Sequence, residues 1–508
     1  MIKFCPSALL CVTLLVIGGN QADADTAQSQ ASPSASATAS AAPTLVPMNA
    51  SQPQGSASAS PSESSAPTAL PTSTPASFVP AALPSKTPVP RVLPPPLDPI
   101  FPSADFPGPT VGEANDTTVY SLQKHLFPKS DGTGIRVYGW FDPGMLLSTS
   151  KHSSYPMTYN TDPNMVNLDQ LIFRVERQPD TTQTKHADWG FRFSSMYGID
   201  YRWTTAQGYF SNQLLGTNAL YGYDPVEAYG IAYSPKLGQG TVWQIGRYIS
   251  PPDIEAQLAP NNFLYSHSIF FDFDAYTQTG ILAETKMSNY WTLLYGVNAG
   301  SDMAPWAQSK HIPTGQLLAR WVSHANKDSV LFGINSINAG GKFTSYRLPN
   351  GNLAGHDDLQ QENITWTHVF NPKFQNQFET YYLYSNNAYQ GGTINNGPVK
   401  FGGGGGAGAF LPGLSVATGA VDYLERKISN KSFLSFRTDY MNDQSGWRSG
   451  FPTSYGSLTL GTTYRPSASQ MLRPEIRYEQ AFGNGVTPYD NGTKKTQTSF
   501  GMDFIQYF

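Results

Sequence analysis

Apolar and polar side chains alternate over most of the chain between Gly134 and Phe508. The alternating segments are about ten to fourteen residues long and rich in aromatic and β-branched residues, and clusters of Gly, Pro, Asn or Ser separate them. A period of two residues predicts β-strands, because successive side chains of a strand point to opposite faces of the sheet. We predict about sixteen strands, centred on Val137, Phe173, Phe193, Tyr229, Ile245, Thr279, Leu294, Arg320, Phe332, Thr365, Tyr382, Val421, Phe436, Leu460, Ile476 and Phe504.

The connections between these strands are alternately short and long. We expect short turns at Ser234–Gly240, Lys286–Tyr290, His324–Asp328, Asn371–Phe374, Ser429–Lys431 and Pro466–Gln470, and a somewhat longer one at Pro179–His186. We expect long loops at Gly208–Tyr223, Pro251–Ser268, Ala339–Asp358 and Ala388–Pro412. Short turns at one end and long loops at the other are typical of outer-membrane β-barrels, whose turns face the periplasm. An even number of strands places both ends of the sheet on the turn side.

Two segments indicate which face points outward. From Trp189 to Tyr201 aromatic side chains dominate one face, and we expect these two residues to mark the two membrane interfaces. From Leu472 to Gln480 four charged side chains share the face opposite an apolar one. Such a face fits a water-filled interior, where a charge costs little. A soluble β-sandwich would also alternate, but its charged face would point outward and its core would be closed.

Residues 1–24 have the form of an export signal. Lys3 supplies the positive start, Ala8–Ile17 a short apolar core, and Ala22-Asp23-Ala24 an A-x-A cleavage site. A membrane anchor is the alternative, but this apolar stretch is shorter than the ~20 residues that span a bilayer. Lipidation at Cys11 is a second alternative, which the bulky Leu10 before it disfavours.

Three further regions follow the predicted signal. Residues 25–96 are mostly Ala, Ser, Pro and Thr with almost no aromatic side chains. Such a segment cannot bury enough apolar surface to offset its ordering entropy, so we expect a disordered tether. Residues 97–133 form a transitional periplasmic segment, with a helix expected at Val119–Leu126. Residues 134–508 form the predicted barrel.

The composition agrees with a barrel and argues against other classes. Charged and aromatic residues each make up 13% of the chain, and the mean hydropathy is -0.33. After the N-terminus no apolar run reaches the ~18 residues expected of a transmembrane helix. The net charge of -4 gives no sign of nucleic-acid binding. Cys5 and Cys11 both lie in the predicted signal, which leaves the mature chain without a cysteine for a disulfide or a metal site.

The last predicted strand ends the chain with large apolar side chains in one phase. Phe500, Met502, Phe504 and Phe508 share this phase, and Gln506 interrupts it. A terminal aromatic residue on an alternating strand resembles the signal that barrel-assembly machinery reads in outer-membrane proteins. We therefore expect Phe504 and Phe508 to carry an assembly signal, with that machinery as a partner.

Short motifs of glycine, aromatic and charged residues resemble the β-barrel porin-2 family. These motifs are Tyr138-Gly139-Trp140-Phe141-Asp142-Pro143-Gly144, Asp188-Trp189-Gly190-Phe191-Arg192-Phe193, Tyr197-Gly198-Ile199-Asp200, Tyr265-Ser266-His267-Ser268 and Gly296-Val297-Asn298-Ala299-Gly300. The resemblance covers most of residues 134–508 and implies a barrel embedded in bacterial outer-membrane lipid, with a channel function. It identifies no solute. Trimers are common among sixteen-stranded porins, so a homotrimer stays open.

Pattern and resemblance together predict a porin-like channel for passive diffusion of small hydrophilic solutes. Selectivity in such a channel comes from the size of the constriction and from charged side chains. The predicted pore-lining residues are Arg136, Arg174, Glu176, Arg192, Asp200, Arg320, Arg437, Asp439, Arg473, Glu475, Arg477 and Glu479. The alternative for each is a charge near a turn or loop. By analogy with other porins, we expect the Pro251–Ser268 loop, with Asp253 and Glu255, to fold inward as a constriction.

Other functions would need residues that the sequence shows weakly or lacks. The main alternative is a surface-interaction or anchoring barrel without an open pore. A barrel enzyme would need a Ser/His/Asp or carboxylate cluster at one rim, which we do not find, so we predict neither an enzyme nor a cofactor. His356-Asp357-Asp358 could hold a cation, but a solvated loop tip explains it more simply, and we predict no metal site. The run Gly402–Gly408 matches G-x-G-x-x-G trivially, because no helix is expected after it.

Overall fold

The computed structural model describes residues 110–128, 132–157, 159–307, 313–338, 346–347, 353–354, 359–391 and 409–508. The predicted signal (1–24) and tether (25–96) lie outside these residues. So do the His356-Asp357-Asp358 motif and the glycine run 402–408.

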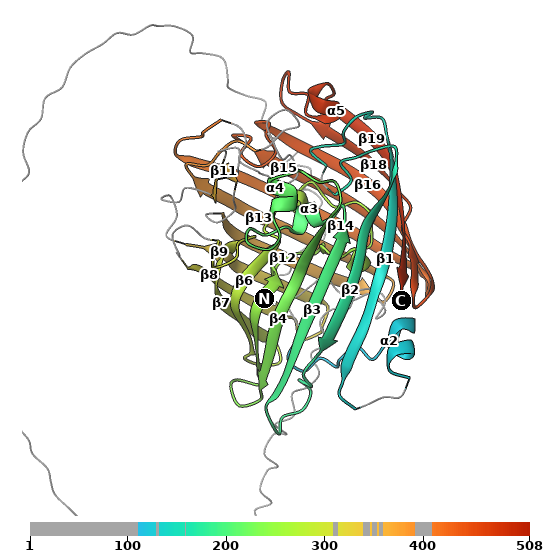
Figure 1. The fold of residues 1–508 in the computed structure, drawn as a ribbon, viewed down its shortest axis with the longest axis vertical. Coiled ribbons are helices and arrows are strands. Elements are labelled where there is room, and N and C mark those ends of the chain that lie inside the picture. The colour runs from blue at the N-terminus through green and yellow to red at the C-terminus, as the bar shows by residue number, and fades with distance from the viewer. Residues whose placement is uncertain are drawn as a thin grey trace, which may run out of the picture. The chain divides into compact units, whose positions relative to one another are not determined.

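The described strands form one closed antiparallel sheet (Figure 1). They are β1 (Ile135–Ser148), β2 (Val166–Arg177), β3 (Asp188–Gly198), β4 (Gly222–Ser234), β5 (Thr241–Ile249), β6 (Thr277–Lys286), β7 (Trp291–Ser301), β8 (Thr314–Val322), β9 (Asp328–Ile337), β12 (Gln360–Asn371), β13 (Phe374–Asn386), β14 (Leu414–Ser429), β15 (Ser432–Asp443), β16 (Thr453–Ser467), β17 (Gln470–Leu472), β18 (Glu475–Ala481) and β19 (Thr496–Tyr507). Each pairs with the strands before and after it in the chain, except that β17 and β18 both pair with β16 and β19, and β1 pairs with β19 to close the barrel. Every predicted strand centre lies in one of these strands, which confirms the barrel and its strand number.

β17 and β18 are two parts of one strand, so the barrel has sixteen strands. The interruption falls at Arg473 and Pro474, between the two parts. Proline has no N–H to give to the ladder, and a break at this position is its expected effect. The carbonyl of Pro474 still accepts a hydrogen bond from the Thr462 N–H at 3.0 Å.

Short helices and a small hairpin are not part of the sheet that forms the barrel wall. They are α2 (Ser121–Leu126), α3 (Tyr201–Thr204), α4 (Asn212–Leu215), α5 (Tyr489–Gly492) and the hairpin of β10 (Tyr346–Arg347) and β11 (Leu353–Ala354). The prediction of a helix at Val119–Leu126 is confirmed by α2. Figure 1 shows α2 near the turn end of the barrel, and α3, α4 and α5 near the loop end. No helix in the described ranges is long and apolar enough to cross a membrane.

The expected interface role of Tyr201 is wrong. β3 ends at Gly198, whose φ is +154° and where a Cβ would clash with the Asp169 carbonyl. The chain then turns away from the sheet, and Tyr201 is fully buried in α3, with its hydroxyl donating to the Ala219 carbonyl at 2.5 Å. The other expected interface residue, Trp189, does lie on the outer face, with 59% of its surface exposed.

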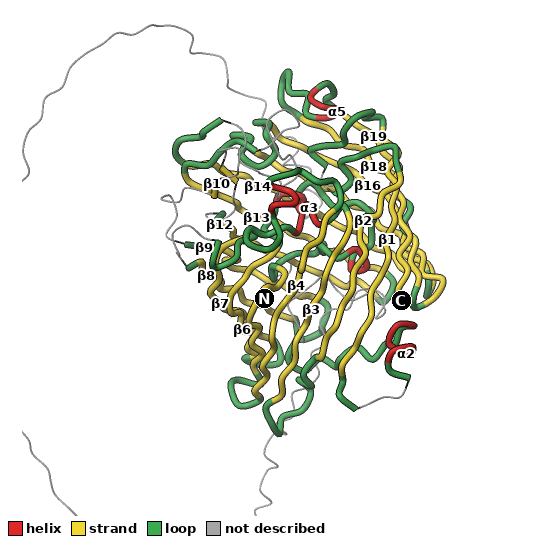
Figure 2. The backbone as a smooth tube through the Cα atoms, in the orientation of Figure 1, coloured by secondary structure: helices red, strands yellow, loops and turns green. Residues whose placement is uncertain are grey.

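Figure 2 traces the strands of the barrel wall in yellow. Along these strands the charged side chains are buried inside the barrel, and the apolar side chains are exposed on its outer face. In β18, Ile476 and Tyr478 are 53% and 42% exposed, whereas Arg477 and Glu479 are each 1% exposed. A soluble protein has the opposite distribution. The inversion is expected of a barrel surrounded by lipid.

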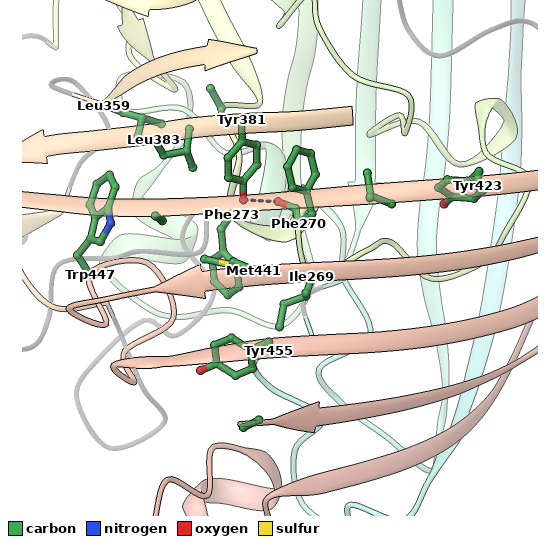
Figure 3. Close-up of a cluster of buried hydrophobic side chains, with 14 of the residues drawn as sticks. Ile269, Phe270, Phe273, Leu359, Tyr381, Leu383, Tyr423, Met441, Trp447 and Tyr455 are labelled. Atoms are coloured by element: carbon green, nitrogen blue, oxygen red, sulfur yellow. Dashed lines mark hydrogen bonds between the residues drawn. The ribbon is translucent and has the colours of Figure 1, made fainter. Parts of the chain in front are cut away.

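Apolar side chains also fill part of the barrel interior (Figure 3). Ile269, Phe270 and Phe273, from the connection between β5 and β6, pack against Tyr381 and Leu383 of β13. The rings of Phe270 and Tyr381 are stacked with centroids 3.8 Å apart, and the Tyr381 hydroxyl donates to the Phe270 carbonyl at 2.7 Å. The interior is therefore not uniformly polar, as the alternation alone would suggest.

Candidate channel interior

The connection between β5 and β6, residues 250–276, lies inside the barrel, and we call it the inward loop. All its residues are buried except Asp253, Ile254 and Asn261, which are partly exposed. It contains two 3-10 turns, η1 (Ala259–Asn261) and η2 (Phe271–Phe273). The sequence predicted an inward fold for Pro251–Ser268, and the inward segment continues to Tyr276. Whether it constricts a pore stays a prediction.

Three arginines of the opposite wall, Arg437, Arg473 and Arg477, hold this loop, and we call them the loop-bound arginines. Arg473 donates from Nη1 to three loop carbonyls, those of Ala259 at 2.6 Å, Leu264 at 2.9 Å and Asn262 at 3.1 Å. Its Nε lies 3.0 Å from a carboxylate oxygen of Asp503 in β19. One guanidinium thus joins the inward loop to the last strand.

The other two loop-bound arginines make similar contacts further along the loop. Arg437 donates to the Ser266 carbonyl at 2.5 Å and to the Glu255 carboxylate at 3.1 Å. Arg477 donates to the His267 carbonyl, and its Nη2 lies 2.9 Å from the Glu479 carboxylate. Arg437, Arg473 and Arg477 are at most 1% exposed.

Wall carboxylates contact the loop by accepting from its backbone. Glu475 accepts from the N–H groups of Tyr265 and Ser266 at 2.9 and 3.1 Å. Asp439 accepts from the Ile269 N–H at 3.0 Å. Backbone N–H groups that are buried need such partners, because an unpaired one costs free energy comparable to a lost hydrogen bond.

A second set of predicted charges forms a separate group, which we call the β1–β4 network. It consists of Arg136, Arg174, Glu176, Arg192 and Glu227. Arg174 pairs with Glu227 at 2.6 Å, and Arg192 lies between Glu176 at 2.9 Å and Glu227 at 3.2 Å. Arg136 pairs with Glu176 at 3.1 Å. Its ion pairs join β1, β2, β3 and β4 within the same wall.

Glu227 was not among the predicted residues. Pro225 interrupts the alternation of β4, and both Val226 and Glu227 are buried. The pairing of β3 with β4 shifts register between Ser194 and Met196, close to Glu227. A bulge of this kind changes which side chains share a face, and a strict period of two cannot detect it.

The remaining predicted residues also lie inside the barrel. Arg320 is 7% exposed on β8. Asp200 is not on a strand but directly before α3, where it accepts from the Gln170 amide at 2.8 Å. In the inward loop, Glu255 accepts from the Ser268 N–H at 2.9 Å, and Asp253 lies near the start of the loop. The structure therefore divides the predicted pore-lining set into two groups and a few separate residues.

The chain before β1 contacts the turn end of the barrel. Val111 is fully buried in an apolar cluster with residues of β4 to β9, such as Tyr233 and Leu282. The Gly112 N–H donates to the Thr181 carbonyl, in the turn between β2 and β3, at 3.2 Å. Asp116 pairs with Arg136 of the β1–β4 network at 2.9 Å. Of this region, only the helix at α2 was predicted from the sequence, and these contacts were not.

His267 of the inward loop is held between aromatic rings. Its ring stacks on Tyr159 and Phe271, with centroids 4.0 and 4.9 Å away. Burial lowers its pKa to about 3, and the neighbouring Arg437 acts in the same direction. His267 is therefore neutral at physiological pH, and we assign it a packing role within the loop.

A closed sixteen-stranded barrel with an apolar outside, charges inside and a long inward loop defines a porin-like barrel. A family model described as "Putative beta-barrel porin-2, OmpL-like" matches residues 134–508, and the chain belongs to this family. The protein is thus a porin-like β-barrel of the bacterial outer membrane.

Several solved porin structures are similar to this chain. The anion-selective porin from Comamonas acidovorans has 9% identity and a TM-score of 0.47, over 74% of this chain and 99% of that one. OmpT of Vibrio cholerae has 10% identity and a TM-score of 0.43, over 75% and 99%. The outer-membrane channel DcaP of Acinetobacter baumannii has 9% identity and a TM-score of 0.42, over 74% and 97%. No curated protein is similar enough to count as a match. The family assignment rests on the family model.

Proposed function

We propose that the protein is a channel through which small hydrophilic solutes cross the outer membrane by passive diffusion. The inversion of the two faces supports this most directly, because Arg, Asp and Glu side chains lie inside a closed sheet whose outer face is apolar. Such a wall pairs its backbone polar groups within the sheet and carries its polar side chains on the inside. The family and the fold both favour a channel over an enzyme.

We further propose which charges act on the solute. Arg136 and Arg192 keep side-chain exposures of 17% and 12%, which leaves them within reach of solutes. The loop-bound arginines are covered, so we propose that they act on the pore through the position of the loop. Asp253 is partly exposed and Glu255 is bonded to Arg437, so of these two loop carboxylates Asp253 is the better candidate for the constriction.

A barrel without an open pore is the second candidate function. The observation that favours it is the chain before β1, since Val111 is buried inside the turn end of the barrel. A segment held there narrows that end. In this case the loops would act as binding surfaces and the barrel as an anchor.

Single-channel recording in planar lipid bilayers distinguishes the two candidates. The full chain is compared with a variant that lacks residues 110–128. Stepwise conductance of the full chain supports the channel. Silence of both proteins contradicts it and supports an anchoring barrel, whereas conductance of the shortened chain alone identifies the segment before β1 as a closure of the pore.

The surroundings of the barrel belong to the same proposal. We propose that residues 1–24 direct export, that residues 25–133 lie in the periplasm, and that Phe504 and Phe508 serve the barrel-assembly machinery. Phe504 is 37% exposed on the outer face. We also propose a homotrimer in the lipid, and cross-linking in native membranes tests it through the mass of the product.

A further inference from the structure

Three carboxylates meet where the inward loop joins the barrel wall, and we call them the carboxylate cluster. Asp253 lies near the start of the loop, Asp274 near its end, and Glu379 on β13. Their ligand oxygens all lie within 4.8 Å of one another. Asp274 and Glu379 are 0% and 1% exposed.

The protein contacts of this cluster hold the carboxylates in place and bring one cation near, the buried Arg448 guanidinium, which donates to the Asp274 carbonyl at 3.4 Å. One arginine does not balance three carboxylates. Glu379 accepts from the Ile254 N–H at 2.9 Å and from the Asn363 amide at 3.2 Å. Asp274 accepts from the Gln361 amide through Oδ1. In the part of the chain that the structure describes, none of the three carboxylates forms an ion pair. Adjacent buried carboxylates cannot all stay ionised without a compensating cation.

Several oxygens at the cluster have no hydrogen-bond partner among the described residues. They include Oδ1 of Asp253 and Oδ2 of Asp274, both buried. A cavity of about 10 Å³ adjoins the cluster and is lined by Asp253 and Gln257. Gln257, which is 2% exposed and lines this cavity, has a third oxygen, Oε1, without a partner among the described residues. A cavity of this size holds about one water-sized sphere.

We propose that the carboxylate cluster binds one divalent cation of the calcium type. Carboxylate and amide oxygens are the ligands that Ca²⁺ prefers, at about 2.3–2.6 Å. Two oxygens on opposite sides of such an ion are separated by about 4.6–5.2 Å and adjacent ones by less, so oxygens that lie within 4.8 Å of one another can share one ion. Mg²⁺ demands shorter, near-octahedral contacts and keeps several waters, so a buried site whose ligands come from three separate chain segments favours the larger and less demanding ion.

The cation joins both ends of the inward loop to the wall. The loop-bound arginines hold the middle of the loop, from Ala259 to His267, on the opposite wall. The carboxylate cluster holds the two ends at β13. Removal of the ion releases the ends of the loop and lowers the resistance of the barrel to unfolding, without breaking the arginine contacts.

The test measures Ca²⁺ binding by the full chain, refolded in detergent without lipopolysaccharide and treated with EDTA. Titration calorimetry is performed on the wild type and on D253N, D274N and E379Q. The matched control is E425Q, because Glu425 is a buried glutamate on β14 that accepts from Gln375 and lies outside the cluster. We expect one Ca²⁺ per wild-type chain, at least tenfold weaker binding in each cluster variant, and unchanged binding in E425Q.

A second measurement follows the temperature at which the folded barrel unfolds in detergent, with Ca²⁺, with Mg²⁺ and with EDTA. We expect Ca²⁺ to raise this temperature in the wild type and in E425Q, and to have no effect in D274N. Absence of Ca²⁺ binding by the wild type overturns the proposal and indicates carboxylates that share protons. Equal binding in the wild type and all three cluster variants also overturns it. Neither measurement depends on conductance, so both outcomes are independent of the proposed channel.

Discussion

The two walls of the barrel use buried arginines differently. In the β1–β4 network, Arg174 and Arg192 direct their charged contacts to Glu176 and Glu227 of the same wall. On the opposite wall, each loop-bound arginine also donates to backbone carbonyls of the inward loop. The arginines of the β1–β4 network therefore find their ionic partners without the inward loop, whereas the loop-bound arginines need the loop to satisfy their N–H donors.

This difference separates charges that can act on a solute from charges that hold the structure. A guanidinium has five N–H donors and loses its hydration when it is buried. In the β1–β4 network, ion pairs within the wall replace the lost hydration of the guanidinium groups, and two of the arginines stay partly exposed. In the opposite wall, contacts with the inward loop replace the hydration of the loop-bound arginines. A substitution of one of these arginines therefore changes the position of the loop first and the pore only as a consequence.

Removal of a loop-bound arginine should have the largest effect. Arg473→Met leaves three loop carbonyls and the Asp503 carboxylate without their main donor. Breaking a buried charge pair costs about 3–5 kcal/mol. We expect that loss in the free energy of unfolding, measured by urea titration in detergent, together with new protease cleavage inside the inward loop.

The control for this experiment is Arg177→Met. Arg177 pairs with Asp188 near the turn end at 3.1 Å, and its side chain is 21% exposed. We expect a loss of about 1 kcal/mol or less for such a pair. Equal losses for the two variants, with the loop still protected from protease, would show that the loop contacts of Arg473 contribute little.

Substitution in the β1–β4 network should have a smaller effect on stability and a larger one on ion selectivity. Glu227→Gln removes the anion shared by Arg174 and Arg192, but Glu176 still contacts Arg192. A hydrogen bond to a charged group contributes about 2 kcal/mol, and we expect a loss of that size. The interior gains net positive charge, so the reversal potential under a salt gradient should shift toward anion selectivity.

A double-mutant cycle with Arg174→Met checks that the two residues act as a pair. We expect the losses of unfolding free energy to be non-additive, because the two side chains are in contact. Strict additivity would show that Arg174 and Glu227 do not act as a pair. An unchanged reversal potential in Glu227→Gln would contradict the role of this network in ion selectivity.

The sequence predicted the barrel well because lipid and interior impose opposite demands on neighbouring residues. Leu472, Pro474, Ile476 and Tyr478 alternate with four charges, and only a sheet with two different environments explains this pattern. Alternation fixes which face a side chain occupies, so the predicted charges were placed inside. It does not encode the partner of each charge, since three partners of Arg473 are backbone carbonyls more than 200 positions away.

Sequence reasoning failed where local backbone geometry departs from the strand. Gly198 ends β3 three residues before Tyr201, and the register shift near Ser194 accompanies the position of Glu227. The carboxylate cluster was also missed, because Asp253, Asp274 and Glu379 come together only when the loop folds inward. Neither the turn after Gly198 nor the carboxylate cluster produces a periodic pattern in the sequence.

A third substitution tests a neutral contact of the inward loop. Tyr381→Phe removes the hydroxyl that donates to the Phe270 carbonyl at 2.7 Å, and keeps the stacked ring. A neutral hydrogen bond contributes about 1 kcal/mol, and we expect that loss in the urea titration. The matched control is Tyr382→Phe, because Tyr382 follows on the same strand and is 39% exposed on the outer face. A larger loss in the control would place the stabilising contact outside the barrel.

The smallest effect is expected for a carboxylate that accepts from backbone N–H groups outside the barrel wall. Asp490 in α5 accepts from the N–H groups of Lys151 and His152 at 2.9 and 2.8 Å, as Glu475 does from the inward loop, and it pairs with Lys494 at 3.0 Å. Burial alone would raise the pKa of Asp490, but these hydrogen bonds outweigh it and lower the pKa below its ordinary value. A lowered pKa means that the stabilisation is complete above the unfolded-state pKa of about 4 and is lost as the pH falls further.

We expect hydrogen exchange at Lys151 and His152 to become faster below that pH in the wild type, after correction for the intrinsic exchange rate. Asp490→Asn should exchange faster already at pH 7, by the equivalent of about 1 kcal/mol, with no further change on acidification. A wild type whose corrected protection is the same at pH 3 and pH 7 would show that the charge of Asp490 does not hold these loops, and that backbone contacts of this kind matter only inside the barrel.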